Sequence, residues 1–209
     1  CLYRRCSAAG PSGCRQRALT RSVQATATVT RLALCARWRL YNAGMHTEKT
    51  RGHRWVLTTF EDTRAAASEV AAIAQRGLSI LTPDLEPGLY DHEKFLGIVK
   101  RLVLAKRCAR VRVLISEPTR TVRNGNRLVG LGRRLDTYIE FRNLHDDYAG
   151  HREAFLLADD VALLYRVNNR RWEGIADTHE PAVARRYLTL FEEIWAASET
   201  SRELRQLRV

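Results

Sequence analysis

Residues 151–167, HREAFLLADDVALLYRV, place a histidine and an aspartate where they could do chemistry. The stretch predicts two short strands, 152–158 and 161–167, which meet at an Asp-Asp turn. His151 stands just before the first strand, and Asp159 stands at its end. An imidazole can act as an acid, a base or a nucleophile, so the spacing raises the hypothesis of a His–Asp catalytic pair.

Arginines gather around the same predicted hairpin, with two asparagines among them. The residues are Arg152, Arg166, Asn168, Asn169, Arg170 and Arg171. Guanidinium forks match phosphate and carboxylate oxygens. The group predicts an anion-binding cleft, for a phosphate-bearing ligand or a nucleic acid backbone. The alternative is a solvated basic rim, which is the ordinary state of surface arginines.

Two further features near the hairpin have a functional and a plainer interpretation. His145, Asp146, Asp147 and His151 have side chains that suit transition metals, but Asp-rich loops are usually solvated turns. No pair of cysteines has CxxC spacing either. We therefore predict no metal and no cofactor. Trp172 could stack on a nucleic acid base, but we expect it to pack against the last helix.

The positive charge of the chain is unevenly distributed. The formal net charge is +12 over 209 residues. Residues 1–44 contribute +8 of it, because they hold eight arginines and no acid. Met45 follows as the only methionine, and its surroundings read like a bacterial start. We therefore predict that residues 1–44 are a non-native or disordered basic extension and that 45–209 form the folded domain. A transit peptide and a lipid-modified Cys1 are the alternatives.

The rest of the chain predicts a cytoplasmic domain. Only Cys108 lies beyond the first 44 residues, and we expect it to be a buried small hydrophobe. No run of about 18 apolar residues is present, so no transmembrane segment is predicted.

Strand and helix patterns alternate after Met45. Strands are predicted at 54–60, 78–83, 110–116 and 137–143, with helices at 61–77, 92–108 and 119–135 between them. The hairpin, a short strand before 177 and a closing helix at 180–198 follow. Such an order predicts an α/β fold with a mixed β-sheet flanked by helices on both faces.

The order of elements and the closing helix resemble half of a phospholipase D-like domain. That superfamily carries an HxKxxxxD motif on a strand, then a hairpin, then a helix matched here by Glu180-Pro181-Ala182, Phe191 and Trp195. The resemblance covers about residues 54–198. The chain also looks like uncharacterised bacterial domains that are sometimes attached to GNAT-type acetyltransferases, which would make such an enzyme a partner.

The resemblance implies phosphodiester chemistry, but the motif is degenerate. In active relatives the histidine attacks phosphorus, the lysine neutralises phosphate oxygens, and two motifs meet from two halves or two subunits. Aligned on Asp159, the histidine position holds Arg152 and the lysine position holds Ala154. Aligned on His151, the lysine position holds Glu153.

We therefore expect a domain without catalysis that binds a phosphate-bearing ligand, a nucleic acid or a protein partner. The alternative is a divergent homodimeric phosphodiesterase that uses His151 and Asp159.

Overall fold

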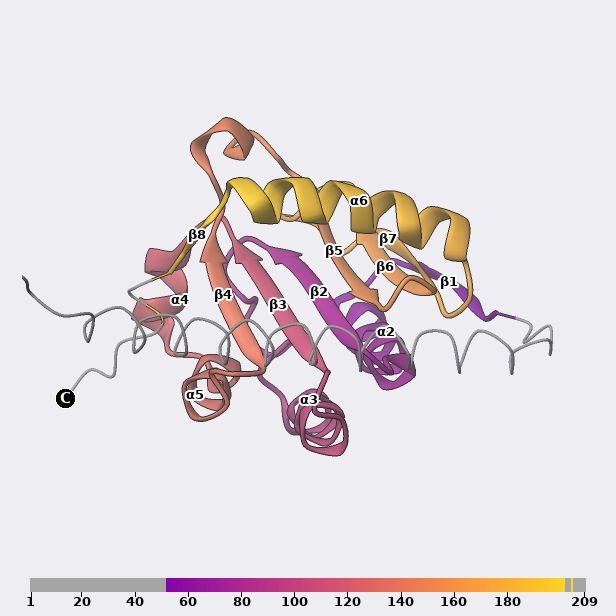
Figure 1. Ribbon diagram of the computed structural model, residues 1–209. Helices are drawn as coiled ribbons and strands as arrows, with labels where there is room; N and C mark the ends of the chain where they lie inside the picture. The colour runs from indigo at the N-terminus through magenta and orange to yellow at the C-terminus, as the bar shows by residue number, and fades with distance from the viewer. Residues whose placement is uncertain (1–51, 202–203, 205–209) are drawn as a thin grey trace, which may run out of the picture. The chain divides into compact units, whose positions relative to one another are not determined.

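A mixed sheet forms the centre of the described part of the chain. The computed structural model describes residues 52–201 and 204. Across those residues eight strands pair in the order β1-β7-β6-β5-β2-β3-β4-β8 (Figure 1). They are β1 (Arg54–Leu57), β2 (Gly77–Thr82), β3 (Arg110–Ile115), β4 (Ile139–Asn143), β5 (Ala154–Ala158), β6 (Ala162–Arg166), β7 (Gly174–Asp177) and β8 (Glu199–Thr200). The predicted extension, residues 1–44, lies outside the described residues.

Parallel and antiparallel pairing divide the sheet into two parts. β2, β3 and β4 are parallel neighbours. β5 runs antiparallel to β2, and β6, β7 and β1 continue the antiparallel part. The predicted mixed sheet is thereby confirmed. The first strand, however, does not pair with the second: β1 lies at the far edge, next to β7.

Helices cover both faces of the sheet, as predicted. α2 (Phe60–Ile73), α3 (Glu93–Ala105) and α5 (Arg127–Arg134) lie on one face, and α6 (Pro181–Ala197) crosses the other (Figure 1). The strands alternate accordingly. In β5, Leu156 and Ala158 join the core under α2 and α3, whereas Phe155 and Leu157 pack under α6. Among the described residues no helix is long and apolar enough to cross a membrane.

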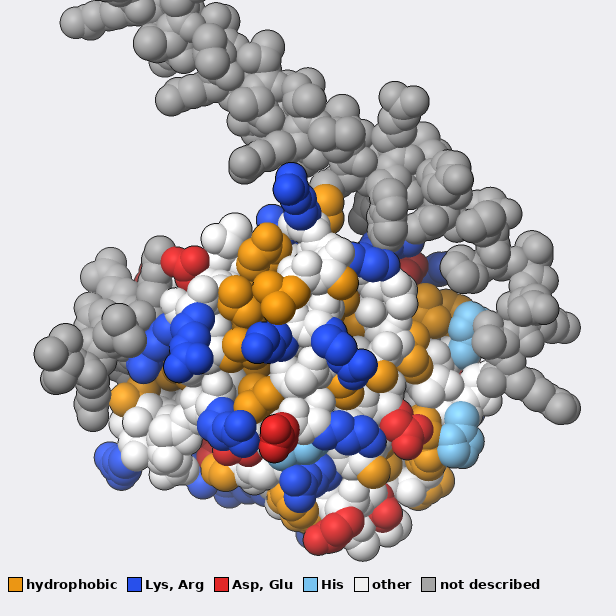
Figure 2. All heavy atoms as spheres, turned by 90° about the horizontal axis from the view of Figure 1, so that it is seen from below, with side chains coloured by type: hydrophobic (Ala, Val, Ile, Leu, Met, Phe, Trp, Pro, Cys, Tyr) orange, Lys and Arg blue, Asp and Glu red, His pale blue; other side chains and the backbone are white. Residues whose placement is uncertain are grey.

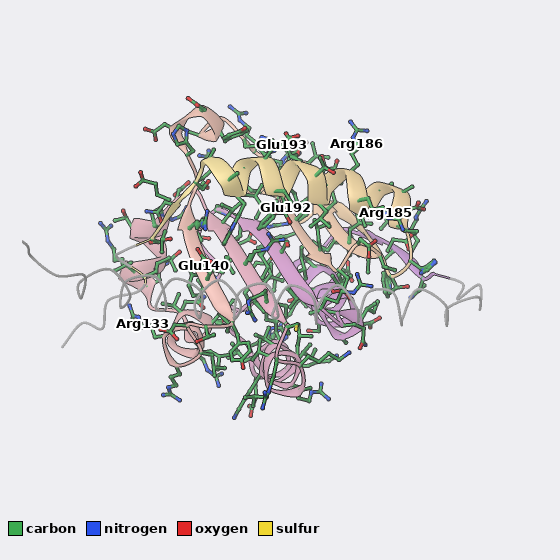
Figure 3. The ribbon with its side chains drawn as sticks, viewed as in Figure 1. Arg133, Glu140, Arg185, Arg186, Glu192 and Glu193 are labelled. Atoms are coloured by element: carbon green, nitrogen blue, oxygen red, sulfur yellow. The ribbon has the colours of Figure 1, made fainter. Side chains whose placement is uncertain are left out.

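A strand arginine holds α6 on the sheet. Arg112 of β3 contacts both carboxylate oxygens of Glu192, at 2.7 and 2.8 Å. Its guanidinium carbon also lies 5.0 Å from the centre of the Phe191 ring, which adds a cation–π contact. Glu192 lies on the side of α6 that faces the sheet, whereas Arg186 points away (Figure 3).

Local capping explains where two of the helices begin. The Thr59 side chain accepts from the backbone N–H of Asp62, and the Asp62 carboxylate accepts from the N–H of Thr59, so a capping box starts α2. The helix predicted over 119–135 is two helices, α4 (Pro118–Asn124) and α5. Gly125 separates them with a φ of 67°, and Asn126 caps α5 through the N–H of Leu128.

One burial prediction is wrong. Cys108 is exposed, because α3 ends at Ala105 and the cysteine lies in the turn before β3.

Candidate anion-binding cleft

Strand ends create a cleft at one edge of the sheet. Its walls are formed by the segment after β3, the segment between β4 and β5, and the segment after β6, so three connections meet there. The cavity has a volume of about 490 Å³. Its lining includes Glu117, Asp146, His151, Arg152, Asn168, Asn169 and Arg170.

Four of the six predicted ligand-binding residues lie on this cleft. They are Arg152, Asn168, Asn169 and Arg170. The backbone N–H of Asn169 donates to the carbonyl of Arg152 at 2.7 Å, which ties the two sides of the hairpin together. The N–H of Arg170 donates to Asn168 Oδ1 at 2.9 Å. Both arginines are exposed, and neither forms an ion pair with any other residue of the described range.

Arg166, the third predicted arginine, points into the core instead. It is 1% exposed. Its Nη2 donates to both carboxylate oxygens of Glu86, and its Nη1 donates to the carbonyl of Arg171 at 3.1 Å. Nε is buried with no hydrogen-bond partner. Arg166 pairs in register with Ala154, so an arginine lies beside the strand position where a lysine would be expected. Its charge is directed at Glu86, on the side of the sheet away from α6.

The buried carboxylate of Glu86 is electrostatically costly. Burial raises its pKa, and the adjacent Arg166 lowers the pKa only in part. Glu86 is a loop acid to which the sequence pattern assigns no role. In the structure it is the counterion that anchors the end of β6, and through Arg166 it holds the loop that carries Asn168, Asn169 and Arg170.

Arg171 and Trp172 also lie outside the cleft. Arg171 is exposed and lies 3.6 Å from Glu173. The expectation that Trp172 packs against the last helix is wrong. Its ring lies edge-on to that of Phe60 in α2, with ring centres 4.9 Å apart. The guanidinium of Arg166 lies 5.0 Å from the centre of the Trp172 ring. The indole therefore covers the buried ion pair.

The two residues of the hypothetical catalytic pair lie at opposite ends of β5. His151 lines the cleft before the strand, and Asp159 follows the strand. His151 Nε2 lies 3.2 Å from Glu153 Oε2, but it is buried and makes no hydrogen bond. The structure therefore does not bring His151 and Asp159 together.

Asp159 has structural contacts of its own. Its carboxylate accepts the backbone N–H groups of Gln75, Arg76 and Gly77 at 2.7, 2.8 and 2.8 Å. Its φ of 55° turns the chain from β5 towards β6. Asp159 thus joins the hairpin to the connection between α2 and β2.

The cleft also contains two acids that the sequence did not place at the anion site, Glu117 and Asp146. Glu117 follows β3 and pairs with Arg120 at 3.1 Å, whereas Asp146 is exposed. Glu117 had a usable signal, because residues that follow parallel strands meet at one edge of a sheet. Within the described residues, no group of three or more His, Cys, Asp or Glu side chains is arranged to hold a metal ion.

Comparisons with solved structures show the fold of the domain. TrmBL2, an archaeal chromatin protein whose structure shows a novel mode of DNA binding, is 13% identical, with a TM-score of 0.52; the match covers 88% of this chain and 67% of that one. Nuc from Salmonella typhimurium, a phospholipase D family member, is 15% identical with a TM-score of 0.51 and covers 73% and 99%. NucT from Helicobacter pylori is 13% identical with a TM-score of 0.50 and covers 72% and 99%.

These likenesses confirm the phospholipase D-like α/β fold. No curated protein matches the chain. Residues 59–207 match a family described as Domain of unknown function (DUF7931), and the chain belongs to this family.

Proposed function

We propose that the chain is a non-catalytic phospholipase D-like domain that binds a phosphate-bearing ligand, in the first place a nucleic acid backbone, in the cleft. The observation that carries the proposal is the pair of exposed arginines without ion-pair partners among the described residues, Arg152 and Arg170. Asn168 and Asn169 line the same cleft. Guanidinium and amide N–H groups are the donors that phosphate oxygens prefer in proteins.

The charge balance of the cleft suits a phosphodiester. Arg120 pairs with Glu117 and also with Asp84, and the cleft itself is lined by two guanidiniums that are unpaired in the described part of the chain and by the exposed carboxylate of Asp146. Such a site attracts one singly charged phosphate group more readily than a cluster of phosphates. TrmBL2, which shares the fold, binds DNA, and this makes a nucleic acid the first ligand to test.

Two features argue against catalysis. Ala154 stands at the lysine position of the motif, so no strand lysine can neutralise a phosphate in the transition state. Asp159 is engaged by three backbone amides and cannot orient His151. The phosphodiesterase alternative rests on His151 alone, whose Nε2 is without a hydrogen bond at the cleft.

The binding experiment compares neighbouring arginines. Fluorescence anisotropy of a labelled single-stranded oligonucleotide is measured against protein concentration at several salt concentrations. Arg170→Ala should weaken binding by roughly tenfold and flatten the salt dependence by about 0.7 in the log–log slope, the value for one lost phosphate contact on a single strand. Arg171→Ala is the matched control, because it removes an arginine that faces Glu173 and not the cleft. Equal effects of the two substitutions, or binding that salt does not change, would refute the proposal.

The catalytic alternative is tested separately. Metal-independent hydrolysis of a bis-aryl phosphodiester that is lost in His151→Ala would establish it and overturn the non-catalytic assignment. A homodimer and an acetyltransferase-type partner stay predictions, and sedimentation of the purified chain with and without such an enzyme tests both.

A further inference from the structure

A second concave surface lies on the helical face, away from the cleft. It is a groove of about 630 Å³ between α3 and α5. α3 contributes Glu93, Leu96, Gly97 and Lys100, and α5 contributes Arg127, Gly130, Leu131 and Arg134. Figure 2 shows this side of the molecule, where Lys and Arg side chains surround hydrophobic ones. None of the groove residues takes part in the cleft.

The floor of the groove is lowered by two glycines that the fold itself does not need. A Cβ on Gly97 or on Gly130 would meet nothing within 4 Å. A helix that contains glycine is less stable than the same helix with alanine. Gly97 and Gly130 therefore weaken their helices, although an added Cβ at either position would cause no steric clash. Gly132 differs, because a Cβ there would lie 2.4 Å from the Phe141 ring. The packing of this chain accounts for Gly132 but leaves Gly97 and Gly130 unexplained.

The walls of the groove are apolar, and its rim is basic. Leu96 and Leu131 are only partly buried. Lys100, Arg127 and Arg134 are exposed, and across residues 52–201 no acidic side chain pairs with them. Glu93 is the one acid on the lining. The groove therefore combines an open floor of two glycines and apolar walls with a net positive rim.

We infer that this groove binds a segment of a partner protein that carries apolar side chains flanked by carboxylates. Apolar side chains would fill the space above Gly97 and Gly130, and the carboxylates would meet the three cations. The ends of this chain are unsuitable occupants, because residues 1–44 carry eight arginines and no acid, and residues 202–209 carry three arginines and one glutamate. A second copy would present the same positive rim. A nucleic acid backbone would satisfy the cations but leave Leu96 and Leu131 without apolar contacts.

The test selects peptides that bind to the groove. A displayed library of random peptides is selected for binding to the full chain and counter-selected against Gly97→Leu. In that variant a leucine fills the floor at a position where the fold has open space. Ala105→Leu is the matched control, since it adds the same side chain at an exposed position of α3 outside the groove. Selected peptides should combine Asp or Glu with Leu, Ile, Phe or Trp.

Binding of a selected peptide is then measured by anisotropy. Gly97→Leu, Gly130→Leu and Arg134→Glu should each weaken it about tenfold or more, whereas Ala105→Leu should leave it unchanged. Circular dichroism of each variant checks that the helices are retained. Recovery of no groove-dependent peptide, or of peptides without acidic residues, overturns the inference. So does oligonucleotide binding that falls in Gly97→Leu, because the groove would then be a nucleic acid surface. Arg170→Ala should not affect the peptide, so the cleft and the groove succeed or fail independently.

Discussion

Removing either partner of the buried ion pair between Arg166 and Glu86 should destabilise the domain, and the two losses should respond differently to pH. Arg166 is 1% exposed and Glu86 is 6% exposed. Breaking a pair buried this deeply leaves an uncompensated charge, at a cost of about 3–5 kcal/mol. Glu86→Gln leaves a guanidinium that stays charged at every accessible pH. Its cost should therefore not shrink between pH 7 and pH 5, and it should grow where the wild-type Glu86 carboxyl, whose pKa burial raises, takes up a proton.

Arg166→Met leaves a carboxyl that can take up a proton. Burial already raises the pKa of Glu86 above its ordinary value of 4.5, and without Arg166 the pKa rises further. The folded protein then binds more protons than the unfolded chain, so the free energy of unfolding increases as the pH falls. The free energy of unfolding increases by at most about 1.4 kcal/mol for each pH unit. The increase occurs in the pH range between the raised pKa of the folded protein and the ordinary value of 4.5. The cost of Arg166→Met should thus shrink as the pH falls from 7 to 5.

Urea unfolding followed by tryptophan fluorescence measures these quantities. Glu192→Gln is the control, because its pair with Arg112 is half exposed and should be worth about 1 kcal/mol or less. The double variant Arg166→Met/Glu86→Leu should cost less than the sum of the single losses, since it leaves no buried charge. A cost of Arg166→Met that is equal at the two pH values, or a cost of Glu86→Gln no larger than that of Glu192→Gln, would refute the reasoning.

Three further predictions concern local stability, and chemical denaturation checks each. Asp159→Ala removes the acceptor of three backbone amides and should cost roughly 2–4 kcal/mol, and a loss below about 0.5 kcal/mol would mean that water replaces the carboxylate. Gly132→Ala should destabilise the domain by about 1–3 kcal/mol, because the added Cβ clashes with Phe141. Gly130→Ala on the same helix should stabilise it by roughly 0.5–1 kcal/mol. Changes in the free energy of unfolding that have the same sign in both variants would contradict the described packing. Hydrogen bonds from Thr59 lower the pKa of Asp62 below 3.8, so its stabilisation is present above that pH and is lost as the pH falls through the lowered value. Asp62→Asn should remove that acid-dependent part.

Local sequence patterns were sufficient for most strands and helices. β5 and β6 follow from their apolar runs and the Asp-Asp turn, and the capping box at Thr59 follows from its spacing. The break between α4 and α5 had a signal in Gly125, but it depends on a left-handed φ that glycine permits and does not require. The position of β1 had no local signal, because its partner β7 lies more than 100 residues away in sequence.

Some residues of the candidate site could likewise be placed from local sequence, and others could not. Arg152 and Arg170 flank the hairpin, and chain order alone brings them to one edge. Arg166 could have been placed inside, because it shares the buried alternation of Ala162 and Leu164 in β6. The hydrogen-bond donors to Asp159 could not be predicted, because these backbone amides come close to its carboxylate only when β5 pairs with β2.

Pairing between β1 and β7 has a consequence for how the chain folds during synthesis. β1 is made before the other strands of the sheet, but its one neighbour in the described sheet, β7, is made after β2 to β6. Until residue 177 has emerged, the hydrogen-bonding partners of β1 do not exist, and Leu57 cannot reach its buried place in the core. The parallel part, β2 to β4, can assemble in the meantime. Closing so distant a contact carries a large loop entropy, so docking of β1 is expected as a late step. A nascent chain stalled before β7 should therefore expose residues 54–57 to protease.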